Sequence, residues 1–375
     1  MTEGGSGNAF DRVLVLCTLF LLTIGVVLIY SASIMESARE AQDGEFYLKR
    51  QLVYVALSLF VALICCAVPS LFWHKSSQHL FTLAIVLLIA VLVVGREVNG
   101  ATRWISLGPV NLQPAELMKL AWVFFLSSYS YKHATEVRST QKGFIKPLVL
   151  LAAFSWMILM QPDLGSCIVI GAITIGILFV AGAGLGKFLL VVLAFVVAVV
   201  GLTLAEPYRL ARVLSFLDPW EDAFGTGYQL TQSLMAFGRG GVTGVGLGNS
   251  LQKLGYLPEA HTDFVTAILG EEYGFAGLCV VILLEFVIVM RTVRLSFAIL
   301  RRAPCFQGYV AFGIAVWFAL QTFINIGAAS GMLPTKGLTL PLVSYGGSAL
   351  IVSMTAIGVL LRIDFEWRNR ILSVG

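Results

Sequence analysis

The sequence predicts an all-α integral membrane protein with about ten transmembrane helices and one long extracytoplasmic loop. Of its 375 residues, 58% are hydrophobic and only 12% are charged, and apolar runs long enough to cross a bilayer recur along the chain. An ordinary soluble domain has about 25% charged residues, whereas a hydrocarbon core about 30 Å thick needs roughly 20 apolar residues per helix. Residues 1–375 are therefore expected to form a single polytopic membrane domain.

Ten apolar runs give the candidate spans in order. They cover residues 13–33, 51–68, 79–95, 114–130, 147–160, 165–183, 186–205, 264–290, 308–329 and 346–362. The first run is long enough to span and no Ala-x-Ala cleavage site precedes it, so we expect a retained first helix rather than a removed signal. An even number of spans puts both termini on the same side of the membrane.

Lys and Arg in the short loops predict the orientation, because cytoplasmic loops carry an excess of these residues. One set of loops contains most of them: Arg12, Lys75, Lys132, Arg138, Lys142, Lys146, Lys187, Arg291, Arg294, Arg301, Arg302, Arg362, Arg368 and Arg370. This set is expected to face the cytoplasm. The opposite set, in which Glu and Asp dilute the basic residues, includes the long loop and is expected to face outward.

Charge and cysteine usage exclude several classes of protein. The formal net charge of +4 is too small, and its residues too dispersed, to indicate nucleic-acid binding. The six cysteines form no CxxC pair, and the sequence contains no His cluster at metal-ligand spacing. Neither a disulfide framework nor a zinc site is predicted.

The long loop, residues 206–262, lies between the seventh and eighth spans. A structureless loop of such length is uncommon unless it is functional, so we expect chemistry or partner contacts here. PYRLARVLSFLDPW is typical of a short amphipathic helix that ends at Asp218 and Pro219, and GYQLTQSLMAF predicts a second helix. GRGGVTGVGLGNS predicts a glycine-rich turn region.

Ionisable residues are dense where the long loop meets the eighth span: Lys253, Glu259, His261, Asp263, Glu271 and Glu272. Charges at a membrane boundary normally line a cavity or stay in the headgroup zone, because their burial beside lipid is costly. One alternative is that they only solvate the end of a helix. Another is that Asp263 caps the helix that begins near Phe264.

Three other segments leave similar alternatives open. Glu116 and Lys119 share one helix face, so they either neutralise one another in the packing or offer a cation to a phosphate in a cavity. Asp163 is either a helix cap or a cavity carboxylate. GMLPTKGLTLPLVSYGGS, with two prolines, is either an outer loop or a re-entrant cavity wall. From these residues alone, a transporter is as well supported as an enzyme.

Several long motifs resemble the SEDS family of shape, elongation, division and sporulation proteins. They are LGYLPEAHTDFVTAILGEEYG, GMLPTKGLTLPLVSYGGS and LRIDFE, supported by YLKRQLVY, NGATRWISLGPVNLQPAELMKL, QPDLGS and DPWEDAFGTGYQ. The resemblance covers nearly the whole chain and is closer to the division-type than to the elongation-type member. It implies a ten-helix SEDS fold in the bacterial inner membrane, with both termini cytoplasmic and the active site facing the periplasm at the division septum.

The resemblance also implies an activity and partners. The expected reaction is polymerisation of lipid II, the undecaprenyl-pyrophosphate-linked disaccharide pentapeptide, into β-1,4-linked glycan strands during septal cell-wall synthesis. The family places an essential carboxylate at Asp263, and cavity residues at Arg50, Glu116, Lys119 and Asp163. The implied partners are an FtsI-like class B penicillin-binding protein, which is a transpeptidase, other divisome membrane proteins and membrane lipids.

Such a reaction needs a base and positive charge beside the departing pyrophosphate. We expect Asp263 to be the base, with a pKa that burial raises and nearby cations lower. The candidate sources of positive charge are Arg50, Lys119, Arg209, Arg212 and a divalent cation, Mg or Mn. Further candidate substrate-binding residues are Lys253, Glu259 and His261. A lipid II flippase and a non-catalytic scaffold for the transpeptidase are the alternatives to an enzyme.

Overall fold

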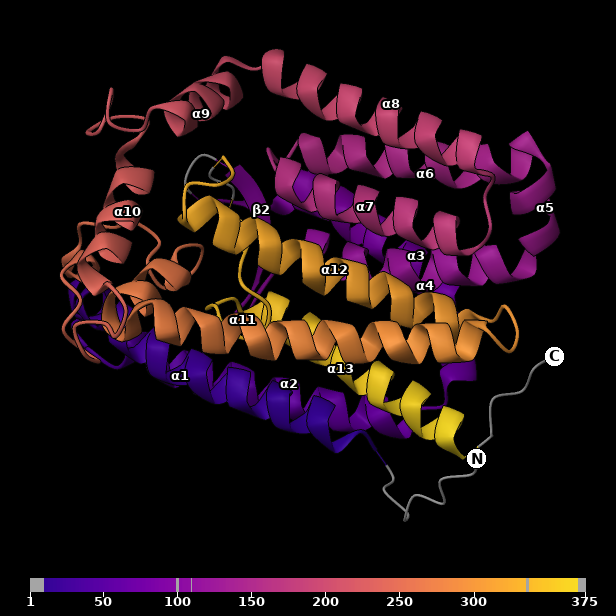
Figure 1. Ribbon diagram of the computed structural model, residues 1–375, viewed down its shortest axis with the longest axis horizontal. Helices are drawn as coiled ribbons and strands as arrows, with labels where there is room; N and C mark the ends of the chain where they lie inside the picture. Colours follow the sequence, from indigo (N-terminus) through magenta and orange to yellow (C-terminus); the bar gives the residue numbers. More distant parts are fainter. Residues whose placement is uncertain (1–9, 99–100, 109, 335–336, 370–375) are drawn as a thin grey trace.

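Each of the ten predicted spans corresponds to a long helix in the computed structural model, which describes residues 10–98, 101–108, 110–334 and 337–369. These helices run side by side in one elongated bundle (Figure 1). They are α1 (Arg12–Ala41), α2 (Phe46–Ala67), α3 (Ser70–Val94), α4 (Pro114–Lys132), α6 (Gln141–Leu159), α7 (Leu164–Val180), α8 (Leu185–Leu204), α11 (Val265–Leu300), α12 (Phe306–Ala329) and α13 (Gly347–Arg368). The predicted multi-span helical class is confirmed.

Most of these helices are suited to a bilayer. Eight of them are long and apolar enough to cross a membrane, and α7 is apolar but only 17 residues long. Helix α4 differs because it contains Glu116, Lys119 and Lys132, and it packs against α3, α7, α12 and α13. Glu116 and Lys119 are tolerated there because they face the interior of the bundle rather than lipid, whereas Lys132 is exposed at the end of the helix.

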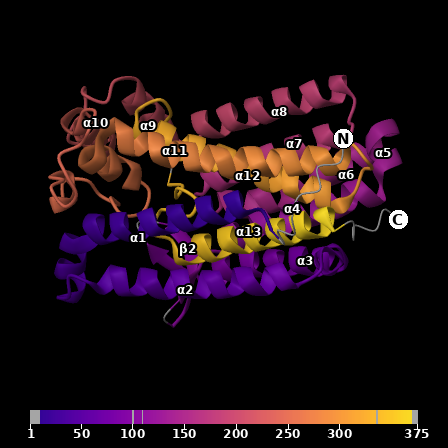
Figure 2. The same cartoon turned by 60° about the horizontal axis from the view of Figure 1, so that its bottom comes forward.

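The first and last helices meet at the same end of the bundle. Asp11, just before α1, lies 3.3 Å from Arg291 of α11 and 3.8 Å from Arg368 of α13. The short helix α5 (Ala134–Ser139) is also at this end, where the predicted basic loops gather, while α9 and α10 are at the opposite end (Figures 1 and 2). This arrangement agrees with an even number of spans.

The segment between α8 and α11 contains both helices that its sequence predicts. These are α9 (Pro207–Leu217) and α10 (Tyr228–Gly240), and a short 3-10 helix, η1 (Gln252–Leu254), follows them. Helix α9 ends where expected, before Asp218 and Pro219, because proline cannot continue a helix.

Helix α11 is longer than predicted and is broken near its beginning. Gly274 has φ 68° and ψ −166°, a conformation that interrupts the helical hydrogen bonds. The glycine-rich turn region supplies the missing partners. Val245 and Gly246 donate their N–H groups to the carbonyls of Glu271 and Glu272, over 3.0 Å each, and the carbonyls of Gly241 and Val242 accept from Phe275 and Ala276. The break therefore fixes the turn region on α11 without leaving buried backbone groups unpaired.

One small sheet adds to the helical fold. Strands β1 (Arg96–Val98), β2 (Ala101–Leu107) and β3 (Val110–Leu112) form an antiparallel sheet between α3 and α4. Leu107 pairs with Val110, so β2 and β3 form a tight hairpin, and Gly108 takes the positive φ of 76° that such a turn requires. The all-α prediction had no strands here, because β1 and β3 have only three residues each and β2 does not alternate strictly between apolar and polar residues.

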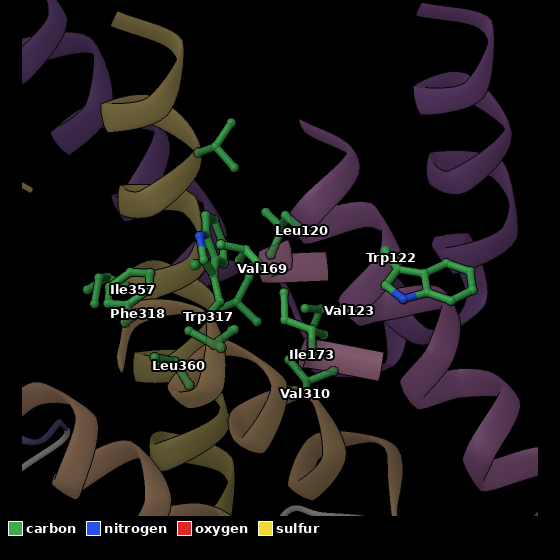
Figure 3. Packing of buried hydrophobic residues seen from close by; sticks show 14 of the residues in the cluster. Leu120, Trp122, Val123, Val169, Ile173, Val310, Trp317, Phe318, Ile357 and Leu360 are labelled. Atoms are coloured by element: carbon green, nitrogen blue, oxygen red, sulfur yellow. The ribbon is translucent and has the colours of Figure 1, made fainter. Parts of the chain in front are cut away.

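The core of the bundle lies where α4, α7, α12 and α13 meet. Figure 3 shows the side chains that gather there, among them Leu120, Val123, Val169, Ile173, Val310, Trp317, Phe318, Ile357 and Leu360, while Trp122 lies to one side of them. Both tryptophans are fully buried, and their indole N–H groups find partners: Trp122 donates to Thr174 and Trp317 donates to Gln321, over 2.7 Å each. Buried polar groups need such partners.

The segment between α12 and α13 is irregular, as its prolines and glycines predict, and it folds back into the bundle. Leu338, Leu340, Leu342 and Val343 are each at most 3% exposed. A Cβ on Gly25, in the middle of α1, would come within 2.7 Å of the Val343 carbonyl oxygen. This segment is therefore a re-entrant wall rather than an outer loop, and protein covers its irregular backbone.

Candidate functional site

A cavity of about 640 Å³ opens at the end of the bundle that carries α9 and α10. Its walls come from α1, α2, the small sheet, the start of α7, α9, α10, the turn before α11 and the re-entrant segment. Among the described residues, its charged lining side chains are Glu36, Arg103, Asp163, Arg212, Glu259 and Asp263. The sequence predicts four of these six, namely Asp163, Arg212, Glu259 and Asp263.

Asp263 lies in this cavity with its carboxylate unused by the fold. Phe264, not Asp263, is the N-cap residue of α11, and the cap makes no side-chain hydrogen bond. Within the described ranges no hydrogen bond reaches the Asp263 carboxylate, although Asn325 Nδ2 donates to the Asp263 carbonyl over 2.9 Å and to the Leu338 carbonyl over 2.6 Å. The backbone is held in place while the acid group stays available.

The surroundings of Asp263 change its proton affinity. Burial raises the pKa of Asp263 from the ordinary 3.8 to about 7, because the charged form loses solvation. The neighbouring carboxylates of Glu259 and Asp163 also raise this pKa, while the guanidinium groups of Arg103 and Arg212 lower it. A carboxyl group that titrates near neutral pH is suited to general-base work.

The turn before α11 fixes the approach to Asp263. Glu259 has a positive φ of 55°, and its carbonyl accepts hydrogen bonds from the N–H groups of Thr262 and Phe264, over 3.2 Å each. The Thr262 hydroxyl also donates to Glu259 Oε2 over 2.6 Å. This closed turn keeps Glu259 and Asp263 on the same wall of the cavity.

Asp163 performs both of its predicted roles. It caps α7, accepting hydrogen bonds from Ser166 N over 3.0 Å and from Ser166 Oγ over 2.7 Å, and it lines the cavity. An N-cap carboxylate also interacts favourably with the helix dipole. Helix α13 also begins at the cavity, but its N-cap residue, Gly346, makes no side-chain hydrogen bond to the first turn.

Glu116 and Lys119 form a buried ion pair instead of lining the cavity. Lys119 is 0% exposed, and its Nζ donates to Glu116 Oε1 over 2.8 Å and to Gln321 Oε1 over 2.7 Å. Gln321 Nε2 in turn donates to the carbonyl of Thr339, which does line the cavity, over 2.8 Å. Within the described residues, hydrogen bonds through Gln321 and Thr339 connect the pair to the cavity wall.

Lys253 also lies away from the described cavity wall. Its Nζ donates to Ser31 Oγ and to Glu272 Oε1, over 2.9 Å each, which joins the long loop to α1 and α11. Arg239 Nη1 donates a hydrogen bond to Glu271 Oε1 over 2.7 Å. These contacts hold the loop on the bundle.

His261 is buried behind the cavity. Its Nδ1 lies 2.9 Å from Oε2 of Glu36, and its carbonyl accepts the N–H of Tyr345 over 3.0 Å. The ring contacts those of Tyr47 and Tyr345. Glu36 itself lines the cavity, and the sequence analysis did not select it.

The remaining predicted cations differ in their positions. Arg212 lines the cavity, whereas Arg50 is not among its described lining residues and lies with its guanidinium over the ring of Phe46, 5.4 Å from the centroid. The side chain of Arg209 lies outside the described part of the structure. Arg103 is the cavity cation that the sequence analysis missed. The signal that could have revealed it is a lone arginine inside the strand-like run ATRWISL directly before the fourth span.

The fold and the cavity define the class: a multi-span membrane protein with an ionisable site at one end of its helical bundle. Comparison with known families then identifies the particular group. Residues 11–369 match the family model described as "Cell cycle protein", which covers FtsW, RodA and SpoVE proteins. The chain belongs to this family, the SEDS family.

Individual relatives match over almost the whole chain. A probable peptidoglycan glycosyltransferase FtsW from Aeromonas salmonicida is 51% identical over 360 residues, which cover 96% of this chain and 91% of the relative. Another from Escherichia coli O157:H7 is 48% identical over 359 residues, covering 96% and 87%.

Solved structures also share the fold. A chain described under "Structural coordination of polymerization and crosslinking by a peptidoglycan synthase complex" has a TM-score of 0.80 and 29% identity, over 98% of this chain and 100% of that one. The rod shape determining protein RodA of Thermus thermophilus has a TM-score of 0.71 and 26% identity, over 96% and 97%. The roles of individual site residues stay predictions.

Proposed function

We propose that this chain is a peptidoglycan glycosyltransferase that polymerises lipid II into β-1,4-linked glycan strands in septal cell-wall synthesis, with release of undecaprenyl pyrophosphate. The observation that carries the proposal is the carboxylate of Asp263, which has a pKa of about 7 and accepts no hydrogen bond from the described residues, in a cavity that also contains two arginines. The FtsW relatives are named probable peptidoglycan glycosyltransferases, and about half of their aligned residues are identical in this chain, which supports the same activity.

In the proposed step, Asp263 accepts the proton of the GlcNAc 4-hydroxyl of the acceptor. The hydroxyl oxygen forms a bond to the anomeric carbon of the lipid-linked MurNAc, and the bond from that carbon to the pyrophosphate oxygen breaks. The electron pair leaves with undecaprenyl pyrophosphate, and the configuration inverts from α to β. Such general-base assistance contributes about 10² to 10⁴ in rate.

The charges of the cavity limit how a pyrophosphate can bind. Four carboxylates and two arginines are its charged lining residues within the described ranges, so positive charge is in short supply. Those ranges contain no group of three or more His, Cys, Asp or Glu side chains placed to hold a metal ion. The proposed transfer step therefore uses no metal ion that is held by protein side chains alone. A Mg or Mn ion carried by the pyrophosphate, with one or two protein carboxylates, stays part of the proposal.

Membrane side and location follow from the same proposal. The basic end of the bundle is the cytoplasmic end, with both termini, so the cavity at the opposite end faces the periplasm. The proposed location is the inner membrane at the division septum, where lipid II is presented on the outer face. A sugar-polymerising site must lie on that side, because the glycan is built outside the membrane.

The proposed partner is a class B penicillin-binding protein of the FtsI-like type, together with other divisome membrane proteins. The solved relative whose description joins polymerization to crosslinking in one complex supports this expectation. The segment between α8 and α11 offers exposed apolar side chains for such contacts, including Val242, Leu247 and Tyr256.

A single purified system tests the proposed function against its alternatives. The full-length protein with its transpeptidase partner is incubated with fluorescent lipid II in detergent micelles, which have no second side to which a lipid can be moved. Glycan ladders establish the polymerase. Lipid movement across liposomes without any polymer would instead identify a flippase. If neither polymer nor lipid movement is observed, the remaining alternative is a non-catalytic scaffold.

The activity should depend on pH through Asp263. Its pKa is raised, so the proton stays bound up to about pH 7, and the base works only when ionised. We expect kcat/KM for lipid II to rise by roughly tenfold per pH unit below 7 and to level off above it. The measurement is the initial polymerisation rate between pH 5 and 9. A rate that is already constant from pH 5 upward would contradict a base whose pKa is about 7.

Gly337 should be sensitive to even a methyl group. A Cβ there would lie 2.9 Å from Asp263 Oδ2, tighter than an ordinary contact. We expect Gly337→Ala to lower the polymerisation rate by about ten- to a hundredfold, because it displaces the base. Gly238→Ala is the matched control, since a Cβ at Gly238 has open space around it. Equal rates for the two variants would contradict the assigned position of Asp263.

A further inference from the structure

Arg103 belongs to the cavity but is anchored behind it. It lies on β2, and its Nε donates to the Gln161 carbonyl over 2.8 Å and its Nη2 to the Pro162 carbonyl over 2.6 Å. These carbonyls follow the C-terminus of α6, where partial negative charge gathers. The anchoring therefore fixes the plane of the guanidinium and leaves Nη1 without a hydrogen-bond partner in the described part of the chain.

The free edge of Arg103 faces the same small space as the proposed base. The point where a Cβ on Gly337 would stand lies 2.9 Å from Asp263 Oδ2 and 4.0 Å from Arg103 Nη1. Gly337 has only a hydrogen there, so the carboxylate and the guanidinium border one gap. An inverting displacement needs a base for the attacking hydroxyl and positive charge for the leaving group, and one group of each kind borders this gap.

The other predicted cations are less well placed. Lys119 is enclosed by Glu116 and Gln321, and Arg50 is not among the described residues of the cavity wall. The exception is Arg212, which also lines the cavity. A planar guanidinium matches phosphate oxygens better than an ammonium does, because it presents its donors as a rigid fork.

We propose that Arg103 binds the pyrophosphate of the lipid-linked donor sugar, and that it thereby places the donor on the sheet side of Asp263. This inference rests on the proposed function and adds the residue that recognises the leaving group. It predicts that the cavity distinguishes a diphosphate from a monophosphate on the same isoprenoid, and that Arg103 provides much of the difference.

The test compares two competitors in the micelle assay with the transpeptidase partner present. Undecaprenyl pyrophosphate should inhibit wild-type polymerisation more strongly than undecaprenyl monophosphate does. We expect Arg103→Gln to reduce that ratio of inhibition constants by about ten- to a hundredfold, the effect of losing hydrogen bonds to a charged group. Arg103→Lys should fall in between, since it keeps the charge but loses the fork. Arg301→Gln, exposed at the other end of the bundle, is the control.

The outcomes separate this inference from the proposed function. If wild-type protein forms no polymer, the proposed function fails before Arg103 is tested. If wild-type polymerises and Arg103→Gln or Arg103→Lys keeps the full preference for diphosphate, the inference is overturned, even when the rate falls. A purely structural role for Arg103 would lower the rate or the stability without changing the ratio of the two inhibition constants.

Discussion

Replacing Asp263 by asparagine should lower the polymerisation rate by about 10² to 10⁴, because asparagine cannot accept the proton of the attacking hydroxyl. The measurement is glycan formation from fluorescent lipid II by the purified complex. Glu221→Gln is the matched control: Glu221 is an exposed acid in the segment between α8 and α11 and is not among the lining residues. Unchanged glycan ladders from the Asp263→Asn protein would remove Asp263 from the mechanism.

The same variant should be more stable at alkaline pH, which shows that the loss of activity is not a loss of fold. A raised pKa in the folded state means that ionisation of Asp263 costs stability as the pH rises from about 4 through 7. Asparagine avoids this cost, which is on the order of 1 to 2 kcal/mol once solvent screening is allowed for. We expect a melting temperature a few degrees higher at pH 8 and no difference at pH 4. A lower melting temperature at pH 8 would contradict the burial argument.

Replacing Lys119 by methionine should strongly destabilise the bundle. The Glu116 carboxylate, 3% exposed, would lose its cation, and an unpaired buried charge of this kind costs about 3 to 5 kcal/mol. The expected result is a fall in melting temperature on the order of 10 °C, measured by thermal unfolding in detergent. A melting temperature within a degree or two of the wild type would show that solvent reaches this pair.

A second substitution should restore the stability. In the Glu116→Gln, Lys119→Met double variant neither position carries a charge, and Gln321 Oε1 still accepts a hydrogen bond from the indole N–H of Trp317 over 2.7 Å. We expect most of the lost stability to return, because removing both charges is often neutral. A stable double variant then decides the role of the Glu116–Lys119 pair: recovered polymerisation assigns the pair to packing, and absent polymerisation assigns the pair to the reaction.

The helices of this fold are predictable because a bilayer restricts the backbone to helical spans of fixed length. The ends of the helices are less predictable. Helix α3 begins at Ser70, nine residues before its apolar run at residue 79, because the polar stretch between them continues the helix beyond the hydrocarbon zone. Helix α11 likewise continues to Leu300. Strands β1 and β3 have only three residues each, and the seven residues of β2 do not alternate strictly between apolar and polar.

The site was predictable where charges crowd at a helix boundary, as at Asp163, Glu259 and Asp263, all of which line the cavity. Spacing alone does not say whether a neighbouring helix covers the face that two charges share, which is why Lys119 lies inside the bundle. Arg103 was missed for a related reason: its partners are backbone carbonyls of a segment far away in the sequence.

The re-entrant segment also affects the order in which the active protein is made. Gly337, Thr339 and Tyr345 line the cavity, and Asn325 holds the backbone of Asp263, yet all four follow Asp263 in the chain. A ribosome delivers the N-terminal part first, so the acid group reaches the membrane before this last part of its surroundings exists. Cell-wall synthesis by this chain therefore begins only after translation has supplied the final helical hairpin, and a nascent chain is catalytically silent.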